Sequence, residues 1–160
     1  MHHKPIIKEK LLAMKILILN GPNLNLLGER EPEIYGSGTM DGVMQMLKEY
    51  YPEIEFDYYQ NNVEGELINR LQATRTDGTD GIVFNAGAYT HTSVALHDCI
   101  RSVEKPVIEV HISNVAKREE FRHVSLIAAA CLGTISGFGI DSYRLGVEAL
   151  KKRLADTPKT

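Results

Sequence analysis

Lys15-Ile16-Leu17-Ile18-Leu19-Asn20-Gly21-Pro22-Asn23 is a short apolar run that ends abruptly in turn-forming residues. Such a run is typical of a strand that is buried on both faces of a parallel sheet. Residues 81–84 and 107–110 repeat the pattern, whereas residues 54–58 alternate between apolar and polar side chains, which favours a half-exposed edge strand. With a further run at residues 134–138, the sequence predicts five strands.

Amphipathic stretches separate the predicted strands. Apolar residues recur at helical spacing in residues 40–50, 64–76, 92–103 and 141–155, and we expect Asp141 to cap the start of the last helix. Strands that alternate with helices, without an internal repeat or a linker, indicate one doubly wound α/β domain. Five strands favour a flavodoxin-like parallel sheet, with three layers in all, over the six-stranded dinucleotide-binding fold.

Length and composition are those of one globular domain. The chain has 160 residues, of which 43% are hydrophobic and 24% charged, and both fractions are ordinary. We expect an N-terminal extension at residues 1–13, a single domain at residues 14–156 and a C-terminal tail at residues 157–160.

Charge and cysteine content exclude several classes of function. A net charge of −3 leaves no basic footprint for general nucleic-acid binding. No segment approaches the roughly 18 consecutive apolar residues of a membrane helix. Cys99 and Cys131 lie far apart without CxxC spacing, so we expect neither a disulfide scaffold nor a zinc site. We expect the protein to be located in the reducing cytoplasm.

The connection at residues 21–39 is much longer than the roughly 4–6 residues that usually join two elements. It contains Arg30, Tyr35 and glycines at positions 28, 36 and 38. Long connections of this kind in compact domains are usually functional or disordered. We therefore expect a mobile lid that carries reactive groups.

Polar side chains gather where the predicted strands end. In open α/β sheets, ligands bind outside the carboxyl ends of the strands. The residues that follow these ends are Asn20, Asn23, Asn85, Tyr89, Thr90, His91, His111, Ser113 and Asn114. Each of them alone would more often be a packing or surface residue. Together they suit a small, polyhydroxylated, acidic ligand better than a flat cofactor.

Signatures of common cofactors and metals are missing from the sequence. Gly36-x-Gly38 and Gly137-x-Gly139 both lack the third glycine of a dinucleotide-binding loop. GxxxxGK[ST], HExxH and GxSxG motifs are absent too. His91 and His111 could share a metal, but carboxylates at metal-binding spacing are not apparent. We therefore expect no cofactor and no metal.

The stretch from Asn20 to Gly36 closely resembles the opening signature of the type II 3-dehydroquinate dehydratases. The resemblance covers residues 14–152 and continues, in family order and spacing, through residues 64–68, 85–98, 109–114, 118–122 and 133–139. Two departures are visible: Val124 replaces a frequent histidine and Ala129 a common proline. The resemblance implies a flavodoxin-like, cofactor-free lyase that reversibly removes water from 3-dehydroquinate to give 3-dehydroshikimate in the shikimate pathway.

The resemblance also implies roles for individual residues. Tyr35 would remove the proton next to the ketone, and His111 would protonate the departing hydroxyl. Asn23 would hold a water at the enolate, Arg30 would tune Tyr35, and Arg118 would assist. The substrate would be bound by Asn85, His91, Asp98, Ile112, Ser113 and Arg122. Asp98 would come from a neighbouring subunit, because the family assembles trimers into a dodecamer.

Elementary electrostatics is compatible with these roles. A cation about 4 Å from a phenolate attracts it by roughly 4 kcal/mol at an effective dielectric near 20, so Arg30 could hold Tyr35 in its charged form. An imidazole such as that of His111 can donate a proton near neutral pH, and Glu109 on the same strand face could orient it.

Three rival hypotheses make different predictions. A lysine Schiff base is disfavoured because no lysine lies between Lys48 and Lys105, the stretch that holds one of the three groups of strand-end residues. A catalytically silent module that binds a hydroxy acid would not need Tyr35 beside Arg30. A flavin carrier would be yellow when purified.

Overall fold

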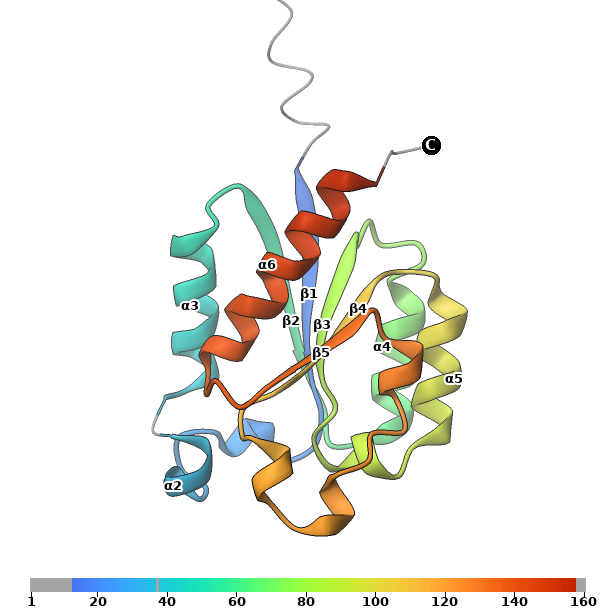
Figure 1. The fold of residues 1–160 in the computed structure, drawn as a ribbon. Helices are drawn as coiled ribbons and strands as arrows, with labels where there is room; N and C mark the ends of the chain where they lie inside the picture. Colours follow the sequence, from blue (N-terminus) through green and yellow to red (C-terminus); the bar gives the residue numbers. More distant parts are fainter. Residues whose placement is uncertain (1–12, 37, 158–160) are drawn as a thin grey trace, which may run out of the picture.

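Five parallel strands form one sheet in the order β2-β1-β3-β4-β5 (Figure 1). The protein is described by a computed structural model that covers residues 13–36 and 38–157. The strands are β1 (Met14–Asn20), β2 (Ile54–Gln60), β3 (Gly81–Asn85), β4 (Val107–His111) and β5 (Gly133–Ser136). This order and direction confirm the predicted flavodoxin-like sheet.

Helices cover both faces of the sheet, which confirms the three predicted layers (Figure 1). One face carries α3 (Met40–Tyr50) and α6 (Asp141–Asp156), and the other carries α4 (Glu64–Ala73) and α5 (Val94–Val103). In β1, Ile16 and Ile18 join the first of the two cores, whereas Leu17 and Leu19 join the second. All of these β1 side chains are fully buried, because alternate residues of a strand point to opposite faces of the sheet.

Four predictions about where elements begin or end are wrong. Asp141 does not cap α6: Ile140 holds the N-cap position, and the Asp141 carboxylate instead accepts hydrogen bonds from Arg144 Nε and Nη2 at 2.7 and 2.9 Å. The α5 helix begins at Val94 rather than residue 92, because Ser93 Oγ caps it by accepting a hydrogen bond from the Leu96 N–H at 2.9 Å.

The other two differences concern where elements end. The α4 helix stops at Ala73 instead of continuing to residue 76. The β5 strand stops at Ser136, because Gly137 adopts a φ of 93°, which is outside the range of strand backbone.

The connection between β1 and α3 is more structured than a plain lid. It contains a 3₁₀ turn, η1 (Leu24–Leu26), and a short helix, α2 (Pro32–Tyr35). Leu24 and Leu27 are buried in the core on the α3 and α6 face, so the first half of the connection packs against the sheet. Tyr35 lies in the second half, where α2 has no buried residue. The predicted opening and closing of this segment stays a prediction.

Further 3₁₀ turns lie near the carboxyl ends of β3 and β4 and before β5. They are η2 (Gly87–His91), η3 (Val115–Lys117), η4 (Glu120–Arg122) and η5 (Ala128–Ala130). At the opposite end of the sheet β1 begins and α6 ends, far from α2 (Figure 1). Residues 1–12 and 158–160, and with them nearly all of the predicted extension and tail, lie outside the described residues. Among the described helices, none combines the length and the apolar character that a membrane span requires.

Candidate active site

A cavity of about 240 Å³ lies at the carboxyl ends of β1, β3 and β4. It is lined by residues that follow these three strands, by Arg30 and Tyr35 from the β1–α3 connection, and by two arginines from the segment after β4. The structure thereby brings together ten of the twelve residues predicted for the site, namely Asn23, Arg30, Tyr35, Asn85, His91, His111, Ile112, Ser113, Arg118 and Arg122.

The two remaining predicted residues lie elsewhere. Glu109 is behind His111 on the same face of β4, and it contacts the imidazole rather than the cavity. Asp98 is exposed on α5 and does not line the cavity of its own chain.

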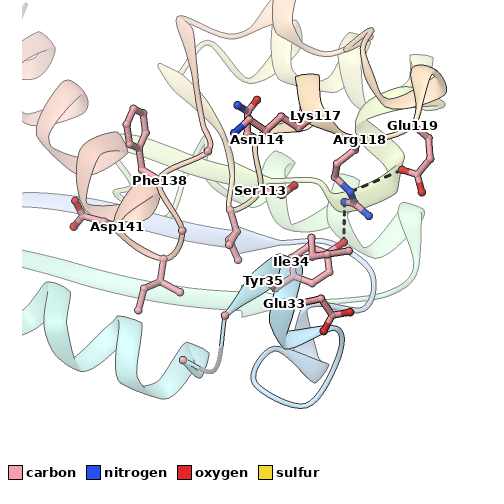
Figure 2. A pocket seen from close by; sticks show the side chains of 16 residues that line it. Glu33, Ile34, Tyr35, Ser113, Asn114, Lys117, Arg118, Glu119, Phe138 and Asp141 are labelled. Carbon is pink, nitrogen blue, oxygen red and sulfur yellow. Dashed lines mark hydrogen bonds and ion pairs between the residues drawn. The ribbon is translucent and has the colours of Figure 1, made fainter.

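Tyr35 lies between two guanidinium groups. The Cζ atoms of Arg30 and Arg118 are both 5.3 Å from the centroid of its ring. Arg118 Nη1 also donates a hydrogen bond of 2.9 Å to the phenolic oxygen (Figure 2). Arg30 is expected from the sequence as the main partner, but its closest ionic contact is Glu31 at 3.4 Å. Both arginines are therefore close enough to act on the phenol, and the direct hydrogen bond comes from Arg118.

A wider groove of about 880 Å³ adjoins the cavity (Figure 2). Tyr35, Ile112, Ser113 and Arg118 line both spaces, so they form the boundary between them. The outer groove has mixed charge, since Glu33, Asp141 and Lys117 all line it. The inner cavity, by contrast, contains three arginines and no carboxylate among its lining residues, and this favours an anionic ligand.

Glu119 links the two arginines on the far side of the cavity. Its Oε2 atom is 2.8 Å from Arg122 Nε and 3.8 Å from Arg118 Nε. A hydrogen bond from its own backbone N–H and then the Arg122 guanidinium hold the pKa of the Glu119 carboxyl below its usual range. Glu119 is therefore a carboxylate that orients both arginines from outside the cavity.

His111 is the last residue of β4 and is fixed by a buried carboxylate. Its Nε2 atom lies 3.0 Å from Glu109 Oε2, and the two residues are 7% and 1% exposed. The other oxygen, Glu109 Oε1, accepts a hydrogen bond of 2.6 Å from Ser125 Oγ. Because a carboxylate accepts, the proton of a neutral His111 ring belongs on Nε2. Nδ1 is then the nitrogen left for a ligand.

His91 lies parallel to His111, with 6.4 Å between the ring centroids. Its Nδ1 atom is 2.8 Å from the carbonyl oxygen of Val124, so Nδ1 carries a proton and donates it. Val124 is one of the two departures from the family pattern, but its side chain is exposed and the contact uses its backbone. The departure therefore leaves this hydrogen bond in place.

Tyr143 is a buried residue beneath the cavity that sequence reasoning missed. Its hydroxyl donates to Asn20 Oδ1 at 2.8 Å and accepts from Asn85 Nδ2 at 3.0 Å. Burial raises the pKa of Tyr143 well above its ordinary value, so the group stays a donor. Asn20, expected at the rim, is instead fully buried and belongs to this network. No local signal points to Tyr143, which is 123 positions from Asn20.

Asn62 was missed as well. Its side-chain Oδ1 accepts a hydrogen bond of 3.0 Å from the backbone N–H of Asn23, which has a left-handed φ of 69°. The carbonyl oxygen of Asn62 accepts a hydrogen bond of 2.7 Å from the Tyr89 hydroxyl. Asn62 therefore ties the turn after β1 to the turn after β3.

Metal-ligating side chains do not cluster in the described part of the chain. Within residues 13–36 and 38–157, no group of three or more His, Cys, Asp or Glu side chains could hold a metal ion. The rings of His91 and His111 face each other, with 6.4 Å between their centroids.

Comparison with known proteins places the chain in a family. The family model described as Dehydroquinase class II matches residues 14–151. A 3-dehydroquinate dehydratase from Chlorobaculum tepidum is 52% identical over 142 residues, which cover 88% of this chain and 96% of that protein. The type II dehydroquinase from Butyrivibrio crossotus has a TM-score of 0.84 at 48% identity, covering 86% of this chain and 97% of that one. The enzyme from Propionibacterium acnes has a TM-score of 0.82 at 40% identity, covering 88% and 99%. The chain therefore belongs to the class II dehydroquinase family.

Proposed function

We infer that this protein is a 3-dehydroquinate dehydratase, a lyase that removes water from 3-dehydroquinate to give 3-dehydroshikimate in the shikimate pathway. The observation that carries this function is the family match over residues 14–151, together with relatives of about 50% identity named 3-dehydroquinate dehydratase. The site residues of the following paragraphs are proposals that rest on this function and on the geometry of the cavity.

We propose that the Tyr35 phenolate is the base. It takes the proton from the carbon next to the ketone, and the electrons of that C–H bond move into an enolate. Support comes from the two guanidinium groups beside the ring and from the hydrogen bond that Arg118 donates to the phenolic oxygen. Positive charge at this position stabilises the phenolate before the reaction. Asn23, which lines the cavity from the turn after β1, would hold a water that stabilises the enolate oxygen.

His111 then acts as the acid. The enolate collapses, the C–O bond breaks, and the departing hydroxyl takes a proton from the imidazolium to leave as water. Since Glu109 occupies Nε2, the proton that is donated sits on Nδ1, and the acid must be the doubly protonated ring. The buried Glu109 carboxylate compensates the positive charge of that ring.

The remaining residues would hold the substrate. Its carboxylate would be bound by the backbone amides of Ile112 and Ser113 and by the serine hydroxyl, and its hydroxyl groups by Asn85, His91 and Arg122. Asp98 would be supplied by a neighbouring subunit, as part of trimers that assemble into a dodecamer. Its exposure on α5, outside its own cavity, is compatible with this role. We place the protein in the cytoplasm, where its two free thiols stay reduced.

One assay tests the function directly. Purified protein is treated with a chelator and mixed with 3-dehydroquinate, and the absorbance of the conjugated enone product is followed. We expect the absorbance to rise, and we expect borohydride together with substrate to leave the activity intact, because no lysine imine forms. Binding of the substrate without any rise in absorbance would instead indicate a catalytically silent binding module.

A further inference from the structure

Ser125 lies between η4 and η5 and is joined to the acid side of the site by Glu109. Its Oγ atom is 2.6 Å from Glu109 Oε1, and Glu109 Oε2 is 3.0 Å from His111 Nε2. We propose that Ser125 is a positioning residue of the dehydratase, which acts through Glu109 to fix the ring of His111. The inference rests on the proposed function, in which His111 is the acid.

The direction of the serine hydrogen bond follows from its second partner. The backbone N–H of Ala128 donates to Ser125 Oγ at 3.0 Å, so one lone pair of the hydroxyl oxygen is already used. A hydroxyl has a single proton, and the carboxylate of Glu109 can only accept. The proton of Ser125 therefore points at Glu109 Oε1. The backbone at Ala128 thus sets the rotamer of the serine hydroxyl.

The carboxylate of Glu109 depends on this donor. It is 1% exposed and Ser125 is half-buried, so little solvent reaches the carboxylate to replace a lost partner. With Ser125 on one oxygen and His111 on the other, each oxygen has one donor and the plane of the carboxylate is fixed. Removal of one donor from a buried ionised group is costly. The group then turns toward another donor or takes up a proton, and both changes disturb the hydrogen bond to His111 Nε2.

Among the described residues, no side chain other than Ser125 donates a hydrogen bond to Glu109 Oε1. Cys131 lies nearby, and burial, followed by the negative charge of Glu109, raises the pKa of its thiol to about 12. That thiol is neutral at working pH and is only a weak donor. Thr134 lies opposite Glu109 on β5. Ser125 is thus the strong donor that the described structure gives to Glu109 Oε1.

The test compares substitutions that differ in the hydroxyl alone. Thr and Val have nearly the same shape, so Ser125→Thr retains the hydroxyl and Ser125→Val removes it, and Ser125→Ala removes it without added bulk. Ser93→Ala is the matched control, because Ser93 Oγ likewise accepts a backbone N–H three residues on but has no link to Glu109. We expect kcat to fall about tenfold in the Ala and Val variants with KM changed less than about threefold, and to stay close to wild type in the Thr and Ser93 variants.

A double substitution tests the route through Glu109. If Ser125 acts only by holding Glu109, adding Ser125→Ala to Glu109→Gln lowers kcat no further than Glu109→Gln alone. The proposal would be overturned if kcat of the double variant fell by the two single-variant factors multiplied together. So would wild-type kcat in the Ala and Val variants.

A spectroscopic measurement keeps the proposal independent of turnover. The ¹⁵N shifts of the His111 ring, assigned with the help of His111→Asn, report which nitrogen carries the proton. At a pH where the ring is neutral, we expect the proton on Nε2 in the wild type and a mixture of tautomers in Ser125→Ala. An unchanged ring in that variant contradicts the role of Ser125. An inactive wild type with the expected change in tautomer would contradict the dehydratase function alone.

Discussion

The proposed acid and the proposed base are held in opposite ways. His111 ends a central strand, is 7% exposed, and receives its orientation from a buried carboxylate on the same strand. Tyr35 ends a four-residue helix without a buried residue. Its ring is only partly buried where it packs against the core on the α3 and α6 face, and Arg30 and Arg118 lie beside it. The sheet therefore fixes the acid, whereas the base sits at the edge of the core and depends on two long side chains.

This difference assigns different sensitivities to the two sides. A change on the acid side should act through packing and buried hydrogen bonds, and on stability as well as rate. A change on the base side should act on the rate with little effect on stability, because few buried contacts are lost. Four predictions test this contrast.

Tyr35→Phe should have the largest effect. It removes the base but keeps the ring between the two guanidinium groups, so we expect kcat to fall by about 10²–10⁴-fold, with ligand affinity within a few-fold and unchanged stability. Steady-state enone formation and calorimetric binding measure the two quantities. Tyr50→Phe is the control, since Tyr50 is exposed and also has an arginine, Arg144, 5.2 Å from its ring. Retained turnover in Tyr35→Phe would rule out its role as the base.

Arg118→Lys should come next. An ammonium group cannot donate to the phenolic oxygen and stack on the ring at once, as the planar guanidinium does. We expect kcat to fall between about tenfold and a hundredfold, although the charge is kept. Arg144→Lys makes the same exchange beside Tyr50 and should leave kcat unchanged. Equal kcat values in the two variants would mean that the charge near Tyr35 matters and the direct hydrogen bond does not.

Tyr143→Phe, a change among the buried residues that pack on the sheet, should lower the stability of the protein. It leaves Asn20 Oδ1 and Asn85 Nδ2 without their buried partner, and we expect the free energy of unfolding to fall by about 2 kcal/mol. Tyr51→Phe is the comparison: it also removes a tyrosine hydroxyl, but its partner Glu148 is exposed and can turn to water. Urea unfolding measures both changes. A loss for Tyr51→Phe as large as that for Tyr143→Phe would contradict the assigned cost of burial.

The smallest effect concerns the thiols. Burial raises the pKa of Cys99, and burial together with the charge of Glu109 raises that of Cys131 to about 12. Thiolate is therefore scarce at pH 8, and we expect both thiols to react slowly with a disulfide reagent in the folded protein and rapidly in urea. Cys131 also reports on the acid side: Glu109→Gln should make it modestly more reactive. Rapid labelling of the folded wild type would contradict this burial.

Much of the fold could be predicted because its signals are local. The apolar run of β1 stops at a turn, and the structure ends the strand within one residue of that point. Prediction failed where one residue changes the backbone, as at Gly137, which ends β5 early through its positive φ. The predicted cap at Asp141 was wrong because its carboxylate has two possible partners, the N–H groups at the start of α6 and the Arg144 guanidinium. It bonds to Arg144.

The site divides in the same way. Residues at strand ends could be placed together because parallel strands bring their carboxyl ends to one edge. Tyr143 and Ser125 could not, because each reaches its partner from a distant segment and neither stands in a pattern of its own. Asn20 shows the limit most clearly: its position at a strand end suggested a ligand contact, but its side chain is fully buried and accepts a hydrogen bond from Tyr143 of α6.

The direction of the parallel strands also determines where a solid support or a fusion partner can be attached without covering the cavity. Met14, where β1 begins, and Asp156, where α6 ends, lie at the end of the sheet opposite α2 (Figure 1). A solid support or fusion partner coupled near either position would leave the mouth of the cavity facing the solution. Immobilisation through Lys117, an exposed lysine that lines the outer groove, would do the reverse and obstruct the entrance.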